Sequence, residues 1–330
     1  MTKRAGAAVV VAVITYRRPE ELRALLPELV EQATGLCPAA EVLVVDNDPA
    51  ASARQLCEGG MAEQVRYVHE PTPGIAAARN RALDEAAASD LLVFIDDDEW
   101  PVSSWLQSLV RLQAATGSAG VVGPVVSEYV VEPGEWVEKG RFFDRRRLTT
   151  GTAVEVAATN NLLLDLKWVR RQGLRFDERF GLSGGSDTLF TRQLVRGGAD
   201  LLWCDEAVVV DRVPADRVQR RWVLRRAFRS GNSWSRTSLE LSGARRMQAR
   251  VALTAQGLPR TLGGALQALW GRLSDDLTQE ARGVRTCLRG AGMLAGAYGY
   301  VYVEYRRPPC SPDASRRRRR VRQPRPRPAP

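Results

Sequence analysis

The sequence predicts an α/β protein of the doubly wound kind, in which a mainly parallel sheet carries helices on both faces. Runs of β-branched and apolar residues, such as Val9 to Ile14 and Leu91 to Ile95, have the length and composition of buried strands. Segments with the apolar spacing of helices separate these runs. Polar and acidic residues follow the runs directly, at the edge where sheets of this kind bind their ligands.

The first half of the chain alternates strands with helices. Val9 to Ile14 is the first expected strand, and Pro19 opens a helix that has acidic residues in its first turn. Further strands are expected at Glu41 to Val45, Val65 to Val68 and Leu91 to Ile95, and further helices at Ile75 to Ala88 and Pro101 to Ala115.

The second half is expected to mix short strands with longer helices. Strands are expected at Thr159 to Leu164, Leu201 to Cys204 and Ala207 to Val213, and helices through Trp168, over Thr188 to Gly197, over Leu239 to Leu273 and over Gly283 to Tyr305. Gly290 to Val303 is uncharged over 14 residues, but a membrane span needs about 20. We therefore predict amphipathic attachment to a membrane surface, with a helical cap packed on the rest of the protein as the alternative.

The positive charge is concentrated in the C-terminal tail. The chain carries +10, but residues 306–330 contain ten arginines and one acid, so residues 1–305 together carry only +1. A tail rich in arginine and proline cannot bury a core, and we expect it to be disordered and attracted to anionic lipid. Specific binding of nucleic acid is not expected, because the basic charge does not belong to the folded body.

Several common sites are absent from the sequence. Its five cysteines are far apart and include no CxxC pair, which argues against a disulfide framework or a thiolate zinc site. The single His69 excludes a multi-histidine metal site, and neither GxGxxG nor GxxxxGK[ST] follows a strand. Because the N-terminus shows no secretory signal, we expect a cytoplasmic protein.

Three consecutive carboxylates follow the strand at Leu91 to Ile95. Asp96 and Asp98 can point to one side of the chain while Asp97 points to the other. Like charges this close are unfavourable unless a cation lies among them, and carboxylate oxygens suit Mg2+ or Mn2+. A cation that keeps open positions can hold a diphosphate. The alternative is a solvated acidic turn.

Four ordered motifs resemble those of family 2 glycosyltransferases. They are Thr15-Tyr16-Arg17-Arg18-Pro19, the strand end Val45-Asp46-Asn47, Pro73-Gly74-Ile75-Ala76-Ala77-Ala78-Arg79-Asn80, and Phe94-Ile95-Asp96-Asp97-Asp98. The resemblance implies the GT-A fold, a Rossmann-like nucleotide-binding sheet with helices on both faces. It also implies a catalytic domain over residues 1–235, with a nucleotide-sugar half at 1–120 and an acceptor half at 121–235. A helical extension would follow at 236–305, and the tail at 306–330.

Carried onto this sequence, the resemblance implies contacts to a nucleotide sugar. Tyr16 and Asp46 would contact the base, and Arg79 the ribose or diphosphate. Asp97 would contact the ribose, and Asp98 would bind the metal with Asp96 beside it. Thr15 and Arg18 belong to the first of these motifs and are predicted to help bind the donor.

The acceptor half carries a candidate catalytic base. The segment Phe176 to Asp187 resembles the family's glycine-containing stretch before an acidic pair, but here the pair is Ser186-Asp187. A carboxylate at Asp187 could take the proton of an attacking sugar hydroxyl. The alternative is that Asp187 is the N-cap of a helix starting at Thr188. Further along, the resemblance implies that Arg221 and Trp222 lie near the donor phosphates or the acceptor, with an amphipathic surface helix as the alternative interpretation of the spaced arginines.

These features together predict a metal-dependent, inverting glycosyltransferase of the hexosyltransferase type. The expected donor is a UDP-sugar and the cofactor Mn2+ or Mg2+. The expected acceptor is a polysaccharide or lipid-linked glycan of the cell envelope, met at the inner face of the membrane. One alternative is a catalytically silent nucleotide-binding or scaffold protein, because Ser186 replaces an acid. A nucleic-acid binder is a further alternative that depends on the tail alone.

Overall fold

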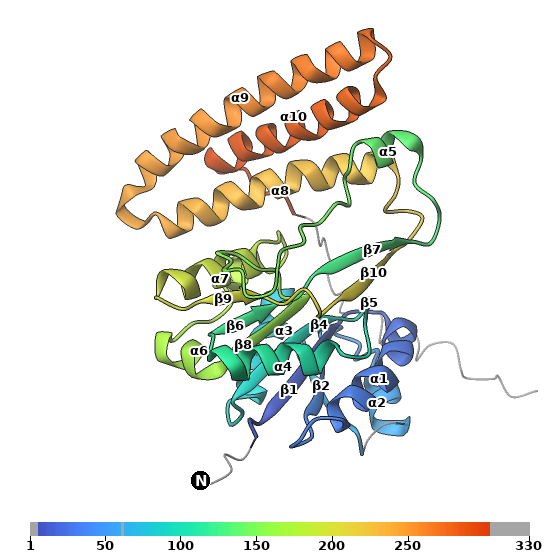
Figure 1. The fold of residues 1–330 in the computed structure, drawn as a ribbon. Helices are drawn as coiled ribbons and strands as arrows, with labels where there is room; N and C mark the ends of the chain where they lie inside the picture. The colour runs from blue at the N-terminus through green and yellow to red at the C-terminus, as the bar shows by residue number, and fades with distance from the viewer. Residues whose placement is uncertain (1–5, 61–62, 304–330) are drawn as a thin grey trace, which may run out of the picture.

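The computed structural model describes residues 6–60 and 63–303, so the arginine-rich tail at 306–330 lies outside the described residues. A seven-stranded mixed sheet forms the centre of the molecule, in the order β3-β2-β1-β4-β8-β6-β9 (Figure 1). Strands β1 (Val9–Thr15), β2 (Glu41–Asp46), β3 (Val65–His69) and β4 (Leu91–Asp96) are mutually parallel, while β8 (Asn161–Asp165) pairs antiparallel with β4 and with β6 (Gly120–Val122). The final strand, β9 (Leu201–Trp203), is parallel to β6.

Helices cover both faces of this sheet, as the sequence predicts. Helices α1 (Pro19–Thr34) and α4 (Trp105–Thr116) bury their leucines against one face, together with the short α2 (Arg54–Gly60). The other face is covered by α3 (Ile75–Glu85), α6 (Leu166–Gln172) and α7 (Ser186–Arg196). Along β4, Leu92 and Phe94 face the second group of helices while Val93 faces the first, which is the alternation expected of a strand buried on both sides.

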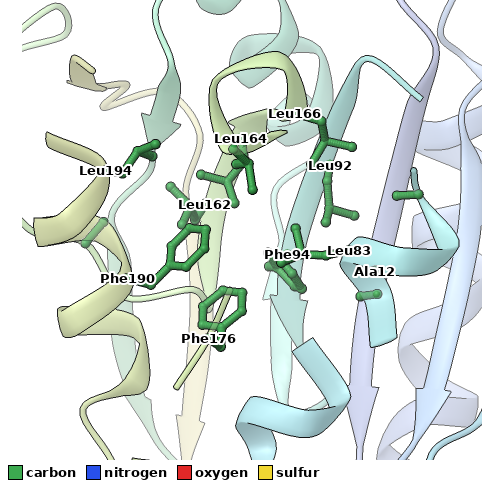
Figure 2. Packing of buried hydrophobic residues seen from close by; sticks show 14 of the residues in the cluster. Ala12, Leu83, Leu92, Phe94, Leu162, Leu164, Leu166, Phe176, Phe190 and Leu194 are labelled. Carbon is green, nitrogen blue, oxygen red and sulfur yellow. The ribbon is translucent and has the colours of Figure 1, made fainter. Parts of the chain in front are cut away.

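Aromatic packing continues from the core toward the strand ends. Phe176 stacks on Phe190 with ring centroids 4.1 Å apart, and Phe94 meets Phe176 edge to face (Figure 2). The guanidinium of Arg79 lies 5.6 Å from the Phe176 ring centroid. An aromatic ring of the core therefore lies against the positively charged Arg79 side chain, close to the carboxyl ends of the strands.

A second, three-stranded sheet lies beside the first. Strand β10 (Val209–Val213) pairs antiparallel with β5 (Glu99–Pro101) and parallel with β7 (Val125–Tyr129). The helix expected from Pro101 instead begins at Trp105, because Glu99–Pro101 is held in β5 by its pairing with β10. β5, β7 and the short α5 (Glu135–Lys139) were not expected from the sequence.

Three long helices form a layer on one side of the two sheets (Figure 1). They are α8 (Arg220–Leu241), α9 (Arg246–Leu273) and α10 (Leu277–Ala297), and α10 packs against both of the others. The boundary expected at residue 235 falls inside α8. The segment from Gly290 was predicted to attach to a surface, but α10 buries Gly290, Met293 and Gly296 between its neighbours. None of the helices in residues 6–60 and 63–303 is long and apolar enough to cross a bilayer.

Candidate active site

A cavity of about 660 Å³ opens at the carboxyl ends of β1 and β4 and extends under the N-terminal part of α8. The residues that line it come from both sheets, the loops between them and α3, α7 and α8. They are Ile14, Thr15, Tyr16, Arg18, Asn47, Ile75, Arg79, Asp96, Asp97, Asp98, Glu99, Arg145, Ala158, Asn160, Gly181, Asp187, Asp211, Arg217, Trp222, Arg226 and Arg229. The cavity thus brings together most of the residues selected from the sequence.

Asp97 is held by two neighbours from the turn after β1. Thr15 donates its hydroxyl to Asp97 Oδ2 at 2.8 Å, and Arg18 Nη1 donates to Oδ1 at 3.0 Å. Burial raises the pKa of Asp97 to about 6, against the opposing effect of Arg18. Arg17 adopts a left-handed backbone conformation with φ 58°, and its neighbours Tyr16 and Arg18 both line the cavity.

Asp98 is paired with two arginines in this structure. Its Oδ2 atom lies 2.5 Å from Arg18 Nη1 and 3.2 Å from Arg217 Nη2. Arg18 therefore bridges the carboxylates of Asp97 and Asp98. Because guanidinium groups neutralise Asp98 here, a metal ion at this carboxylate has to displace at least one of them.

Asp96 is closely enclosed by protein and only partly open to the cavity. This enclosure raises the pKa of Asp96 to about 7, with the charges of Asp98, Asp97 and Asp187 acting in the same direction and Arg79 opposing them. Asp187 lines the same cavity as Asp96. Next along the chain, burial raises the pKa of Glu99, whose Oε2 atom is buried without a hydrogen-bond partner.

The start of α3 is fixed by Asn47 and by a close contact between two glycines. Asn47 donates to the carbonyls of Glu70 and Thr72 and accepts from the Gly74 amide at 3.2 Å. Gly74 has φ 122°, and a Cβ there would meet the Gly181 backbone at 3.4 Å. This contact joins the helix carrying Arg79 to the segment that leads to Asp187.

Asp187 lies in the first turn of α7. The helix begins at Ser186 after the left-handed Gly185, so the alternative that Asp187 caps a helix starting at Thr188 is wrong. Gly185 occupies the N-cap position, and the Ser186 hydroxyl accepts a hydrogen bond from Arg79 Nη1 at 3.0 Å. Asp187 Oδ1 accepts from the Thr188 amide at 2.7 Å, and the side chain is left on the cavity wall.

Basic side chains form the opposite wall of the cavity. Trp222, Arg226 and Arg229 lie on one face of α8, four and then three residues apart, and the Arg226 guanidinium lies 5.1 Å from the Trp222 ring centroid. Arg221, selected from the sequence with Trp222, does not line the cavity. The helical spacing from Trp222 is the signal that identifies Arg226 and Arg229.

Two further arginines that the sequence did not single out also line the cavity, where they pair with carboxylates. Arg145 forms an ion pair with Asp211 of β10, and Arg217 lies between Asp98 and Asp211. Asp211, Glu99 and Asn160 were also missed, because the second sheet and a long loop bring them to the site. No local motif marks them.

Asp46 does not line the cavity. It is fully buried, and its carboxylate accepts hydrogen bonds from the Asp48 and Ala53 amides and from the Tyr67 hydroxyl. The same carboxylate contributes to a raised pKa of Tyr67, of which burial is the main cause. In this structure Asp46 orders the loop after β2, behind the side chains that face the cavity.

Acidic and basic side chains line the cavity in equal number. Six carboxyl groups and six arginines offer partners both to a cation and to an anion. The described residues contain no group of three or more acidic, histidine or cysteine side chains arranged as a complete metal site. Mg2+ and Mn2+ often take only one or two carboxylates and complete their shell with phosphate oxygens and water. Asp96 and Asp98 fit such a partial site.

Two comparisons of the amino-acid sequence with known proteins find glycosyltransferase-related matches. The family model described as Glycosyl transferase family 2 matches residues 10–171. The succinoglycan biosynthesis protein ExoM of Rhizobium meliloti (strain 1021) is 35% identical over 249 residues, which cover 74% of this chain and 79% of that protein.

Solved structures share the fold. The mannosyltransferase PcManGT from Pyrobaculum calidifontis, in complex with GDP-Man and Mn2+, superposes with a TM-score of 0.58 at 18% identity, covering 88% of each chain. GalNAc-T7 with UDP, GalNAc and Mn2+ gives a TM-score of 0.50 at 12% identity, covering 64% of this chain and 45% of that one. The protein described here spans less than half of the GalNAc-T7 chain.

Proposed function

Because this chain belongs to glycosyl transferase family 2 and is a glycosyltransferase, we propose that it moves a hexose from a nucleotide sugar to a hydroxyl of a growing glycan, with inversion at the anomeric carbon. The observation that carries this proposal is the single cavity lined by Asp187, the triplet Asp96–Asp98 and the arginines of α8. It supplies a base, a partial metal site and cationic groups for a diphosphate within one enclosed space.

The donor diphosphate would lie between the acidic turn and α8. Arg226 and Arg229 can donate paired hydrogen bonds to phosphate oxygens, and Arg79 can do so from below the sheet edge. A divalent cation, Mn2+ or Mg2+, held by Asp98 and Asp96 would offset the charge that develops on the departing diphosphate. Arg18 and Arg217, which pair with Asp98 in this structure, would then be free to pair with phosphate oxygens.

Asp187 is the proposed general base. Its carboxylate would take the proton of the acceptor hydroxyl as the oxygen attacks the anomeric carbon and the bond to the diphosphate breaks. A single base without a carboxylate nucleophile gives direct displacement, and therefore inversion. Ser186 stands where the family has a second acid. Its hydroxyl accepts a hydrogen bond from Arg79, and Asp187 still lines the cavity, so the proposed role of Asp187 does not require that second acid.

The finer identities in this proposal come from the sequence and from the relatives. UDP-sugar is the proposed donor, while GDP-Man in PcManGT makes GDP the competing nucleotide. The name of ExoM favours a polysaccharide precursor as the acceptor. We propose a lipid-linked glycan, met at the inner face of a membrane. A thermal-shift panel of UDP and GDP, with and without Mn2+, tests base and metal together, because a bound ligand raises the melting temperature.

The decisive experiment compares Asp187→Asn with the wild type. We expect the variant to lose about a hundredfold to ten-thousandfold in turnover of nucleotide sugar, because a general base contributes roughly 10²–10⁴-fold. Binding of nucleoside diphosphate should persist. Asp275→Asn is the matched control, since Asp275 is exposed between α9 and α10 and its positive φ suits asparagine. Nucleotide binding without turnover by the wild-type protein would instead favour a catalytically silent role.

A further inference from the structure

Helix α9 has an unusual distribution of side-chain size. The residues that it buries are Leu253, Gly257, Gly264 and Gly271, so only one of them is large. Its large apolar side chains lie on the outside, where eight are exposed, and the described residues expose sixteen in total. The eight are Met247, Val251, Leu258, Leu262, Leu266, Leu269, Trp270 and Leu273.

The glycines explain why the large side chains face outward. Gly257, Gly264 and Gly271 recur every seven residues and bring the α9 backbone against α10. A Cβ at Gly264 would lie 2.4 Å from the Cys287 amide nitrogen, and one at Gly271 would lie 2.2 Å from that of Glu280. Gly283 of α10 makes the reciprocal approach to Ala268 at 2.3 Å. With α10 on the glycine side, the apolar side chains point away from it.

A helix that is exposed to water usually buries its large apolar residues. α9 shows the reverse pattern, with small residues buried and large apolar residues exposed. Helices in contact with lipid show this arrangement, because hydrocarbon solvates leucine as well as a protein core does. α9 is nevertheless not a spanning segment. At about 1.5 Å per residue its 28 residues extend roughly 42 Å, enough for a helix that lies in the plane of a surface.

Charge identifies the kind of surface. Residues 220–297 contain fourteen arginines, no lysine and four acids, a net charge of +10, whereas residues 1–219 carry −8. The positive charge is therefore not confined to the tail, as the small total charge of residues 1–305 suggested, because the acidic first part hides a basic helical layer. α9 itself has four arginines and no acid, and Arg246, Arg260 and Arg272 are exposed. Arg272 lies beside Trp270 and Leu273 in the last turn of α9, where a long arginine side chain can reach lipid headgroups, and tryptophan favours the same interface.

A second copy of the chain fits this face less well. In a two-fold dimer the same face meets itself, so two helical layers that each carry +10 would come together. An anionic bilayer offers both hydrocarbon and negative charge. We infer that the outward face of α9 is an in-plane contact surface for anionic lipid.

Contacts between helices connect α9 to the wall of the active site. α9 packs on α10, α10 packs on α8, and the N-terminal part of α8 carries Trp222, Arg226 and Arg229 into the cavity. A lipid-anchored acceptor would therefore approach the cavity from the side of the helical layer. The inference deepens the membrane part of the proposed function and rests on that function only for the identity of the acceptor.

Flotation of the full-length protein with vesicles tests the inference. The vesicles contain phosphatidylcholine with phosphatidylglycerol, and binding is measured at low salt and at about 1 M salt, where the screening length is about 3 Å. High salt suppresses attraction by the arginines, including those of the tail, and leaves apolar insertion. We expect Leu262→Glu/Leu266→Glu to lower the vesicle partition coefficient at high salt by roughly tenfold or more, because two leucines no longer enter the bilayer.

The control is Val130→Glu/Val131→Glu, which places the same charges on two other exposed apolar residues, and it should float like the wild type. Circular dichroism and nucleoside diphosphate binding report whether each variant is folded. The inference is overturned if the wild type does not float, if the α9 variant floats normally at high salt, or if that variant instead dissociates a dimer. Nucleotide-sugar turnover is measured separately, so vesicle binding without turnover would contradict the proposed function alone.

Discussion

Adjacent glycines in α9 should respond in opposite directions to the same substitution. Gly263 is exposed, and a Cβ there meets nothing within 4 Å. Alanine is favoured over glycine inside a helix by about 1 kcal/mol, so Gly263→Ala should raise the free energy of unfolding by roughly that amount. Gly264→Ala would gain the same helix propensity. The added Cβ, however, would lie 2.4 Å from the Cys287 amide nitrogen and 2.8 Å from the Gly283 carbonyl oxygen.

The cost at Gly264 follows from what the methyl group would meet. Ordinary van der Waals contact begins near 3.4 Å, so α9 and α10 would have to separate by about 1 Å. The obstacles are backbone atoms, which cannot rotate away as a side chain can. Overpacking of this kind costs about 1–3 kcal/mol, and separation also weakens the contacts of Gly257 and Gly271 with α10. We expect a net loss of about 1–2 kcal/mol for Gly264→Ala.

Thermal unfolding followed by far-UV circular dichroism measures both variants. One kcal/mol corresponds to about 2–4 °C in a domain of moderate size, so the two melting temperatures should differ by at least about 4 °C. Because the residues are neighbours on one helix, the comparison cancels the effect of helix propensity. A Gly264→Ala variant as stable as Gly263→Ala would refute the close packing of α9 on α10, and with it the reason that the apolar side chains face outward.

Two other substitutions test the cavity. Arg226→Gln should weaken binding of nucleoside diphosphate by about tenfold or more in calorimetry, because a charge-assisted hydrogen bond is lost, whereas Arg221→Gln should not; equal losses would contradict the assignment. Asp96→Asn should raise the melting temperature considerably more at pH 8 than at pH 5, without added metal. The raised pKa of Asp96, about 7, means that the folded state holds its proton more tightly than the unfolded chain, so the wild type loses stability as pH rises from about 4 through 7. A difference independent of pH would show that Asp96 is not strained by its charge.

The sheet and the first half of the site were predictable from the sequence. Each N-terminal motif directly follows its own strand, so the strand ends alone bring Thr15, Arg18 and Asp96 to one edge of the sheet. Asp187 follows the same logic, because glycines mark the turn into its helix. The single continuous helix expected over Leu239 to Leu273 was wrong only in its start, since the chain breaks between α8 and α9.

Features that depend on pairing between distant segments could not be predicted from the sequence. β5 and β7 are strands because β10 lies between them, and this pairing brings Glu99 and Asp211 to the cavity. Composition also does not reveal which side of α9 packs against α10 and which side is exposed. The uncharged run starting at Gly290 has the composition of a surface segment, yet its glycines mark the buried helix of the layer. The seven-residue recurrence of glycine in α9 was the available signal.

The cavity lies where two oppositely charged parts of the protein meet. The body up to residue 219 carries −8 and supplies the acidic strand ends, while the helices from residue 220 carry +10 and supply Arg226 and Arg229. The proposed diphosphate and its cation would therefore meet side chains from both parts. α8 joins them physically, since its first turns line the cavity and its later residue Gly231 packs where a Cβ would meet the Arg289 carbonyl of α10 at 1.9 Å. A boundary drawn at residue 235 would therefore cut the helix that connects the proposed lipid-contact surface to the proposed donor site.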